Sequence, residues 1–155
     1  MKIVINKCYG GFSLSPLAIK RMAELQGRKC FFFRDLVLKK DRIRKPITLE
    51  EACRDFFFDA FDTDDLSFLS KPKDWFEMSE EEKHAFNEAY EKHHLTDRPD
   101  DRTDPLLIQV VEELGAEADG KCAQLQVVEV PDGIEWELDE YDGIESIAEK
   151  HKTWG

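Results

Sequence analysis

The segment 102–115, Arg-Thr-Asp-Pro-Leu-Leu-Ile-Gln-Val-Val-Glu-Glu-Leu-Gly, constrains the fold more than any other stretch of the chain. Asp104 can accept hydrogen bonds from the first free N–H groups of a helix, and Pro105 at the next position has no N–H to leave unpaired. Gly115 can adopt the left-handed conformation that closes a helix. Apolar residues recur at the spacing of one helix face, at Leu106, Leu107, Val110, Val111 and Leu114. The pattern predicts a helix over 105–114 with one buried face.

Two polar residues, Arg102 and Thr103, directly precede this predicted helix. Free N–H groups and the helix dipole favour an anionic group at such a position. Asp104 can fill that role as an ordinary cap, and Arg102 can simply pair with Asp100, Asp104 or the acidic C-terminal hairpin. The motif alone leaves a ligand site and a structural cap both open.

The N-terminal segment 2–9 is rich in β-branched residues and predicts a strand that stops at Gly10-Gly11. Phe12 follows, and Ser15-Pro16 starts a helix over 15–26 that Gly27 ends. Two glycines between a strand and a helix can form a nest of N–H groups that holds an anion. A tight turn that needs glycine for its dihedral angles gives the same pattern, and the spacing of a P-loop or dinucleotide fingerprint is missing.

The middle of the chain predicts a buried strand over 29–38 and two helices, over about 49–61 and from 79 to about 94. Each helix starts with a capping box, Thr48 with Glu51 and Ser79 with Glu82. The first helix carries a cluster of phenylalanines, which is typical of a core. We interpret residues 1–155 as a single domain in which 39–99 is an inserted, more variable segment.

The C-terminal part alternates apolar and polar residues over 124–130 and 134–140, separated by a turn at 131–133. This pattern predicts a hairpin with Trp136 and Leu138 buried and with Glu135 and Glu137 exposed. The predicted fold class is α+β. It has an antiparallel sheet with two helices packed on one face, plus a variable helical insertion, the strands being 2–9, 29–38, 124–130 and 134–140.

Composition limits the class of protein. The chain has 155 residues, 41% of them hydrophobic, which is enough for one core, and a net charge of −12. The charge excess is +8 in residues 1–54, −8 in 55–99 and −12 in 100–155. A chain with two acidic thirds is not expected to bind DNA. It has no candidate membrane span or signal peptide, and four scattered cysteines without a C-x-x-C pair indicate free thiols in a reducing cytoplasm.

No catalytic or metal-binding motif is present in the sequence. The adjacent His93 and His94 would point about 100° apart on a helix, which does not suit a shared metal ion. A binding protein without metal or cofactor is therefore favoured over an enzyme. The candidate ligand-binding residues are the turn glycines, their neighbour and nearby polar groups: Gly10, Gly11, Phe12, Arg28, Arg102, Thr103 and Asp104.

The two ends of the chain resemble a known group. The stretches "INKCYGGFSLS" and "RTDPLLIQVVEELG", and the C-terminal "AQLQVVEVPDGIEWELDEYDGIESIAEKHKTW", resemble a family of small, mostly uncharacterised bacteriophage and bacterial proteins. The chain is also similar to the phage anti-defence sponge proteins that counter Thoeris immunity. That resemblance implies an oligomer, in the cytoplasm of an infected bacterial host cell, that sequesters a cyclic ADP-ribose isomer or cyclic oligonucleotides without cleaving them. It assigns no ligand residue in this sequence.

Two further expectations concern partners. Open edge strands and the aromatic residues Tyr141, Trp154 and 31–33 predict a homo-oligomer. The alternative function is that of an acidic interaction protein, in which residues 100–155 occupy a basic surface of a host or defence protein.

Overall fold

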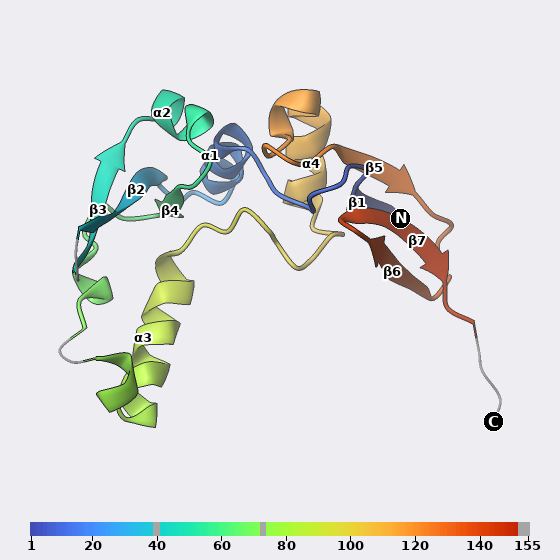
Figure 1. Cartoon of the computed structure of the whole chain (residues 1–155). Helices are drawn as coiled ribbons and strands as arrows, with labels where there is room; N and C mark the ends of the chain where they lie inside the picture. Colours follow the sequence, from blue (N-terminus) through green and yellow to red (C-terminus); the bar gives the residue numbers. More distant parts are fainter. Residues whose placement is uncertain (39–40, 72–73, 152–155) are drawn as a thin grey trace.

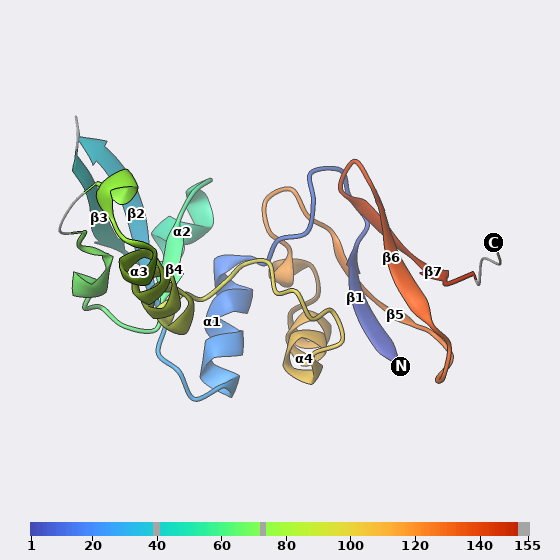
Figure 2. The same ribbon diagram turned by 90° about the horizontal axis from the view of Figure 1, so that it is seen from below.

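A computed structural model describes residues 1–38, 41–71 and 74–151 (Figure 1). The fold is α+β, as predicted, and its strands form three small antiparallel sheets rather than one. Figure 2 shows them in layers, with the sheet β3-β2-β4 at one end, then α1, then α4, then the sheet β1–β5, and the sheet β6–β7 at the other end.

Helices α4 (Pro105–Leu114) and α1 (Pro16–Leu25) begin as the sequence predicts. The Asp104 carboxylate accepts a hydrogen bond from the Leu106 N–H at 2.8 Å, and the Ser15 hydroxyl accepts one from the Ala18 N–H at 3.1 Å. Gly115 and Gly27, with φ of +56° and +70°, follow the two helices. Their apolar faces meet in one core that includes Ala18, Ile19, Ala23, Leu107, Val110 and Val111.

Strand β1 (Lys2–Asn6) is buried on both faces because it lies between two layers. It pairs with β5 (Leu125–Glu129), with Val4 opposite Val127. Val4 belongs to the core formed with α4, whereas Ile3 and Ile5 alternate onto the side where Figure 2 shows the β6–β7 sheet.

The predicted hairpin between 124–130 and 134–140 is wrong. Strand β6 (Trp136–Tyr141) pairs instead with β7 (Ile144–Glu149), through the two-residue turn Asp142-Gly143. These two residues have φ of +50° and +88°, as a type I′ turn requires. Trp136 and Leu138 are half-buried and Glu135 and Glu137 are exposed, so the predicted orientation of the strand is correct.

The middle of the chain forms its own sheet from β2 (Phe31–Leu38), β3 (Asp41–Ile47) and β4 (Asp59–Phe61). The predicted single sheet containing 29–38 is therefore wrong. Helix α2 (Leu49–Arg54) has the expected capping box but ends early, because residues 59–61 pair with β2. The predicted burial of the phenylalanine cluster holds for Phe61, yet Phe56 and Phe57 are 61% and 80% exposed.

Helix α3 (Glu80–His93) has the second predicted capping box and projects away from the layers (Figure 1). Three 3-10 turns complete the fold: η1 (Ser67–Leu69), η2 (Trp75–Glu77) and η3 (Gly115–Ala118). All four cysteines are free thiols; Cys53 and Cys122 are exposed, and burial raises the pKa of Cys30 to about 11. Within the described ranges, no helix combines the length and apolar content of a membrane span. Trp154 lies outside the described residues.

Candidate functional site

Two turns that are far apart in the sequence meet in space. Gly143, in the turn between β6 and β7, packs so closely on Gly10 and Gly11 that a Cβ at position 143 would overlap their backbone nitrogens. Gly143 also has φ of +88°, so both the close packing and the backbone conformation require glycine at this position. The contact borders a cavity of about 470 Å³, here called the turn hollow, which is lined by Gly10, Gly11, Phe12, Arg98, Arg102, Glu140, Asp142, Gly143 and Glu145.

Arg102 is the centre of a buried ion pair beside this hollow. Its guanidinium carbon lies 3.4 Å from the centroid of the Phe12 ring, and its Nη2 donates to Glu145 Oε1 at 3.1 Å. The side chains of Arg102 and Glu145 are only 15% and 6% exposed. Burial lowers the pKa of Arg102, and Glu145 partly offsets that effect. The Nη1 atom is buried without a hydrogen-bond partner in the described part of the chain.

Asn6 connects the same pair to the strands. The Asn6 N–H donates to Glu145 Oε2 at 2.8 Å, and its side-chain amide donates to the carbonyls of Cys8 and Gly143. Its Oδ1 accepts from the Gln124 N–H at 2.8 Å. The sequence interpretation missed Asn6 and Glu145. A polar residue closing a β-branched strand, and an acid after the Asp-Gly turn, were the available signals.

The predicted ligand residues divide into two groups. Gly10, Gly11, Phe12 and Arg102 come together at the turn hollow. The other three have local partners: Thr103 Oγ1 donates to Asp101, Asp104 caps α4, and Arg28 pairs with Asp62 at 2.9 Å, away from the hollow.

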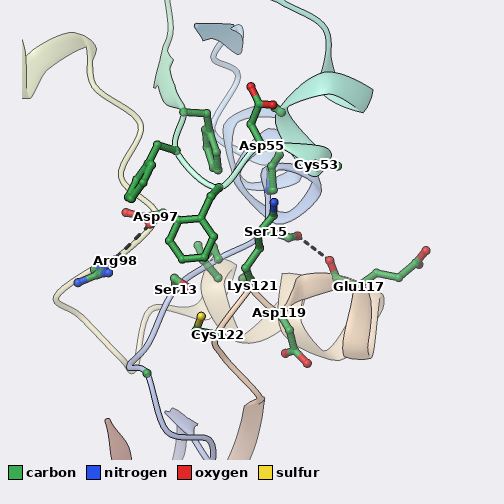
Figure 3. A pocket seen from close by; sticks show the side chains of 18 of the residues that line it. Ser13, Ser15, Cys53, Asp55, Asp97, Arg98, Glu117, Asp119, Lys121 and Cys122 are labelled. Atoms are coloured by element: carbon green, nitrogen blue, oxygen red, sulfur yellow. Dashed lines mark hydrogen bonds and ion pairs between the residues drawn. The ribbon is translucent and has the colours of Figure 1, made fainter. Parts of the chain in front are cut away.

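A second cavity, of about 480 Å³, adjoins the turn hollow and shares Gly10 and Arg98 with it. We call it the aromatic cleft, because Phe56, Phe57 and Phe58 form part of its wall. It lies between the start of α1, the end of α2 and the turn at 119–122 (Figure 3). The cleft was missed from the sequence because the phenylalanines were assigned to a helix in the core.

The charges around the cleft are mixed. The Asp55 carboxylate pairs with Arg34 at 2.5 Å, and the Asp119 carboxylate accepts from the Leu125 N–H at 2.8 Å. Figure 3 shows the carboxylates of Asp55, Asp119 and Glu117 directed away from the centre of the cleft. These acids therefore contribute less repulsion toward an anion inside than their number suggests.

Two cations face the cleft. Arg98 is 69% exposed, and its Nε is 4.0 Å from Asp97, which is a loose ion pair. Lys121 donates to the Arg54 carbonyl, and its Nζ lies 5.7 Å from the centroid of the Phe56 ring. Arg98 lines both cavities, so its long side chain can reach a ligand that spans them.

The backbone of the Gly10 turn adds hydrogen-bond donors. Gly10 and Gly11 have φ of +110° and +90°. Among the hydrogen bonds of residues 1–38, 41–71 and 74–151, none has the N–H of Gly10, Gly11 or Phe12 as its donor. Gly10 lines both cavities, whereas Gly11 and Phe12 line the turn hollow.

No group of three His, Cys, Asp or Glu side chains in the described ranges is arranged to hold a metal ion. The two adjacent histidines have other roles. His93 Nδ1 lies 2.8 Å from Asp62 Oδ1, and the His94 ring stacks on Tyr90 with the centroids 4.8 Å apart. Comparison of the chain with protein-family models, with curated proteins and with solved structures found no match.

Proposed function

We propose that this chain is a binding protein that holds a small phosphorylated nucleotide in the aromatic cleft and sequesters it without cleaving it. The ligand class is that implied by the resemblance, a cyclic ADP-ribose isomer or a cyclic oligonucleotide that serves as an immune signal. The observation that carries the proposal is the run Phe56–Phe58, which lines a concave cavity and leaves two of its rings largely exposed.

Aromatic rings exposed in a cleft are suited to bases. Every base presents a π-face, and stacking on an aromatic side chain contributes about 1–3 kcal/mol per base. The cavity volume of about 480 Å³ lies within the range usual for small-molecule sites. Phe56 and Phe57 also pack edge to face with ring centroids 4.8 Å apart, which presents a broad apolar surface to a ligand.

The phosphate groups have donors nearby. With a base against the phenylalanines, the phosphates extend toward Arg98 and the N–H groups of the Gly10 turn. A guanidinium makes bidentate contacts to phosphate, and successive backbone N–H groups form an anion nest. Arg102 is a positioning residue in this proposal, because Glu145 already occupies one of its amino groups.

Sequestration without cleavage is favoured by the chemistry of the lining. Ser13, Ser15, Cys53 and Cys122 are potential nucleophiles in the cleft, but no histidine of the described residues lines either cavity. The Ser15 hydroxyl already donates to the Glu117 carbonyl at 2.5 Å. A hydroxyl or thiol is a weak nucleophile at neutral pH unless a base activates it, and the nearby carboxylates of Asp55 and Asp119 are already engaged with Arg34 and the Leu125 N–H.

One observation favours the alternative of an acidic interaction protein. The β6 strand presents Glu137 and Asp139 on its outer face, and the adjacent Glu140, Tyr141 and Asp142 are exposed as well. This surface fits a basic partner, and a complex built on it would weaken steeply with salt.

Calorimetric titration separates the two functions. Cyclic ADP-ribose isomers and cyclic oligonucleotides are titrated into the protein at low and at physiological salt, and the ligand is recovered after denaturation for chromatography. We expect saturable binding of at least one nucleotide, a modest salt effect and an intact ligand. Failure of every nucleotide to bind would contradict the proposal and favour the acidic interaction protein; a cleaved ligand would show an enzyme.

A further inference from the structure

We infer that two copies of this chain pair through the open edge of β5, which joins their β1–β5 sheets into one four-stranded sheet. This interface does not involve the aromatic cleft, so a test of the dimer does not depend on whether the proposed nucleotide binds.

The edge of β5 away from β1 has unused hydrogen-bonding groups. The Val130 N–H donates to the Met1 carbonyl at 2.9 Å, and the Lys7 N–H donates to the Gln124 carbonyl at 2.8 Å. The backbone N–H and C=O groups of the even-numbered β5 residues therefore point toward β1. The N–H groups of Val127 and Glu129 point away from β1, toward the open edge. No other strand of the described residues pairs with β5, which lies at the margin of the molecule in Figure 1.

The free edges of β1, β3 and β6 are protected. On β1, the outward N–H groups of Val4 and Asn6 donate to the Arg102 carbonyl and the Glu145 carboxylate. Edge strand β3 carries charge and a proline at Arg44, Lys45 and Pro46, and β6 carries carboxylates at Glu137, Asp139 and Glu140. Charge and proline are the usual means of preventing edge pairing. The β5 edge, Leu-Gln-Val-Val-Glu, has a single charge and no proline.

The register of pairing follows from which donors are free. The Leu125 N–H is already bound to Asp119 Oδ1 at 2.8 Å, which leaves Val127 and Glu129. An antiparallel, two-fold arrangement centred on Val128 places Val127 of each copy opposite Glu129 of the other and uses all four N–H groups. Pro131 of the second copy then falls opposite Leu125, where neither residue needs to donate.

This register also avoids a charge conflict. Glu129 faces Val127 of the second copy rather than another carboxylate, and Gln126 faces Val130. The product has four strands, which are more stable than an isolated pair. An antiparallel edge is complementary to itself, so a second copy of the chain is the partner that fits both the donors and the side chains.

Disulfide trapping tests the register, in a background where the exposed Cys53 and Cys122 are changed to serine. Val128→Cys would face its own copy in a non-hydrogen-bonded pair with Cα atoms about 4.5 Å apart, which permits a disulfide. Gln126→Cys is the matched control on the same strand face, because two copies of residue 126 would lie about 13 Å apart. We expect a covalent dimer on oxidation of the first variant only.

Two further measurements test the same interface. Light scattering of the wild type should give at least twice the chain mass of 18.1 kDa at micromolar concentration. Mixing Gln126→Cys with Val130→Cys protein should give a crosslinked heterodimer even if Val128→Cys does not fold. A strict monomer, equal crosslinking of Val128→Cys and Gln126→Cys, or no crosslink in the mixture would each overturn the inference.

Discussion

The two ends of the molecule are stabilised in different ways. The end that contains β1, α4, β5, β6 and β7 is held by contacts between residues far apart in the chain, such as the bond between Asn6 and Glu145, which are 139 positions apart. The middle segment, residues 31–95, is organised around Phe61, whose ring packs against Phe33, Phe68 and Tyr90 at 5.8–5.9 Å.

The two kinds of contact predict different unfolding behaviour for the two parts. The long-range network can break only when the N- and C-terminal segments separate, so it should open with global unfolding. Helix α3 of the middle segment has no fully buried residue, so it should open locally at lower cost. The aromatic cleft lies between the two parts, with Phe56–Phe58 from one and the Ser13 and Lys121 segments from the other.

The largest effect should come from Arg102→Ala. The change leaves the Glu145 carboxylate buried without its cation, and breaking a buried ion pair costs about 3–5 kcal/mol in the free energy of unfolding. Urea unfolding measures it. Arg98→Ala, which removes an exposed arginine, should change the free energy by less than about 0.5 kcal/mol.

If Arg102→Ala does not fold, the double change Arg102→Met with Glu145→Gln replaces the pair by groups without charge, and it should recover part of the stability. Unfolding midpoints that coincide for Arg102→Ala and Arg98→Ala would show that the network does not hold the two ends together.

A smaller effect should come from the helix caps. Asp104→Ala and Ser79→Ala each remove an N-cap, at a cost of about 1 kcal/mol. Because α4 belongs to the cooperative end, Asp104→Ala should lower the midpoint of global unfolding. Ser79→Ala should leave that midpoint nearly unchanged and speed amide hydrogen exchange in α3 alone. The same global shift for both variants would argue against separate opening of α3.

The smallest effect should come from pH. Burial lowers the pKa of His94, which the carboxylates of Asp59 and Asp97 only partly offset, so the folded state favours the neutral ring. The stabilisation from the neutral His94 ring is fully present above the ordinary histidine pKa near 6.5, and it is lost as the pH falls below that value. Hydrogen exchange at the C-terminal end of α3 should therefore quicken between pH 7.5 and 5.5, after correction for the intrinsic exchange rate.

His94→Gln is the control, because it removes the titrating group from the ring stack with Tyr90. Asp62 does not interfere in this window. Burial tends to raise its pKa, but hydrogen bonds from His93 and Arg28 lower it overall, so its effect is lost only near and below its ordinary value of 3.8. An unchanged pH dependence in His94→Gln would assign the effect to another group.

The helix starts could be predicted from the sequence because their determinants are local. Ser15, Thr48, Ser79 and Asp104 all cap the helices assigned to them. Each cap depends only on residues within one helical turn, which a single sequence displays directly.

Strand pairing could not be predicted in the same way. Both Asp132-Gly133 and Asp142-Gly143 are turn signals, but only the second joins its flanking strands, because β5 pairs with the distant β1. The exposure of Phe56 and Phe57 was missed for a similar reason: pairing of residues 59–61 with β2 stops the helical pattern. At the site, the sequence suggested that the Gly10 turn and Arg102 could contact one ligand if the fold brought them together. The aromatic cleft could not be predicted, because it is formed by tertiary contacts alone.

Replacing one phenylalanine ring tests most directly whether the aromatic cleft binds a nucleotide. Phe57→Ala removes an exposed ring from the cleft wall, and Phe76→Ala removes a ring that is 94% exposed in η2, outside both cavities. Calorimetric titration with the tightest-binding cyclic nucleotide should show a loss of about 1–3 kcal/mol, roughly a fivefold to 150-fold weakening, for Phe57→Ala and no change for Phe76→Ala. Equal affinities of the two variants and the wild type would contradict the claim.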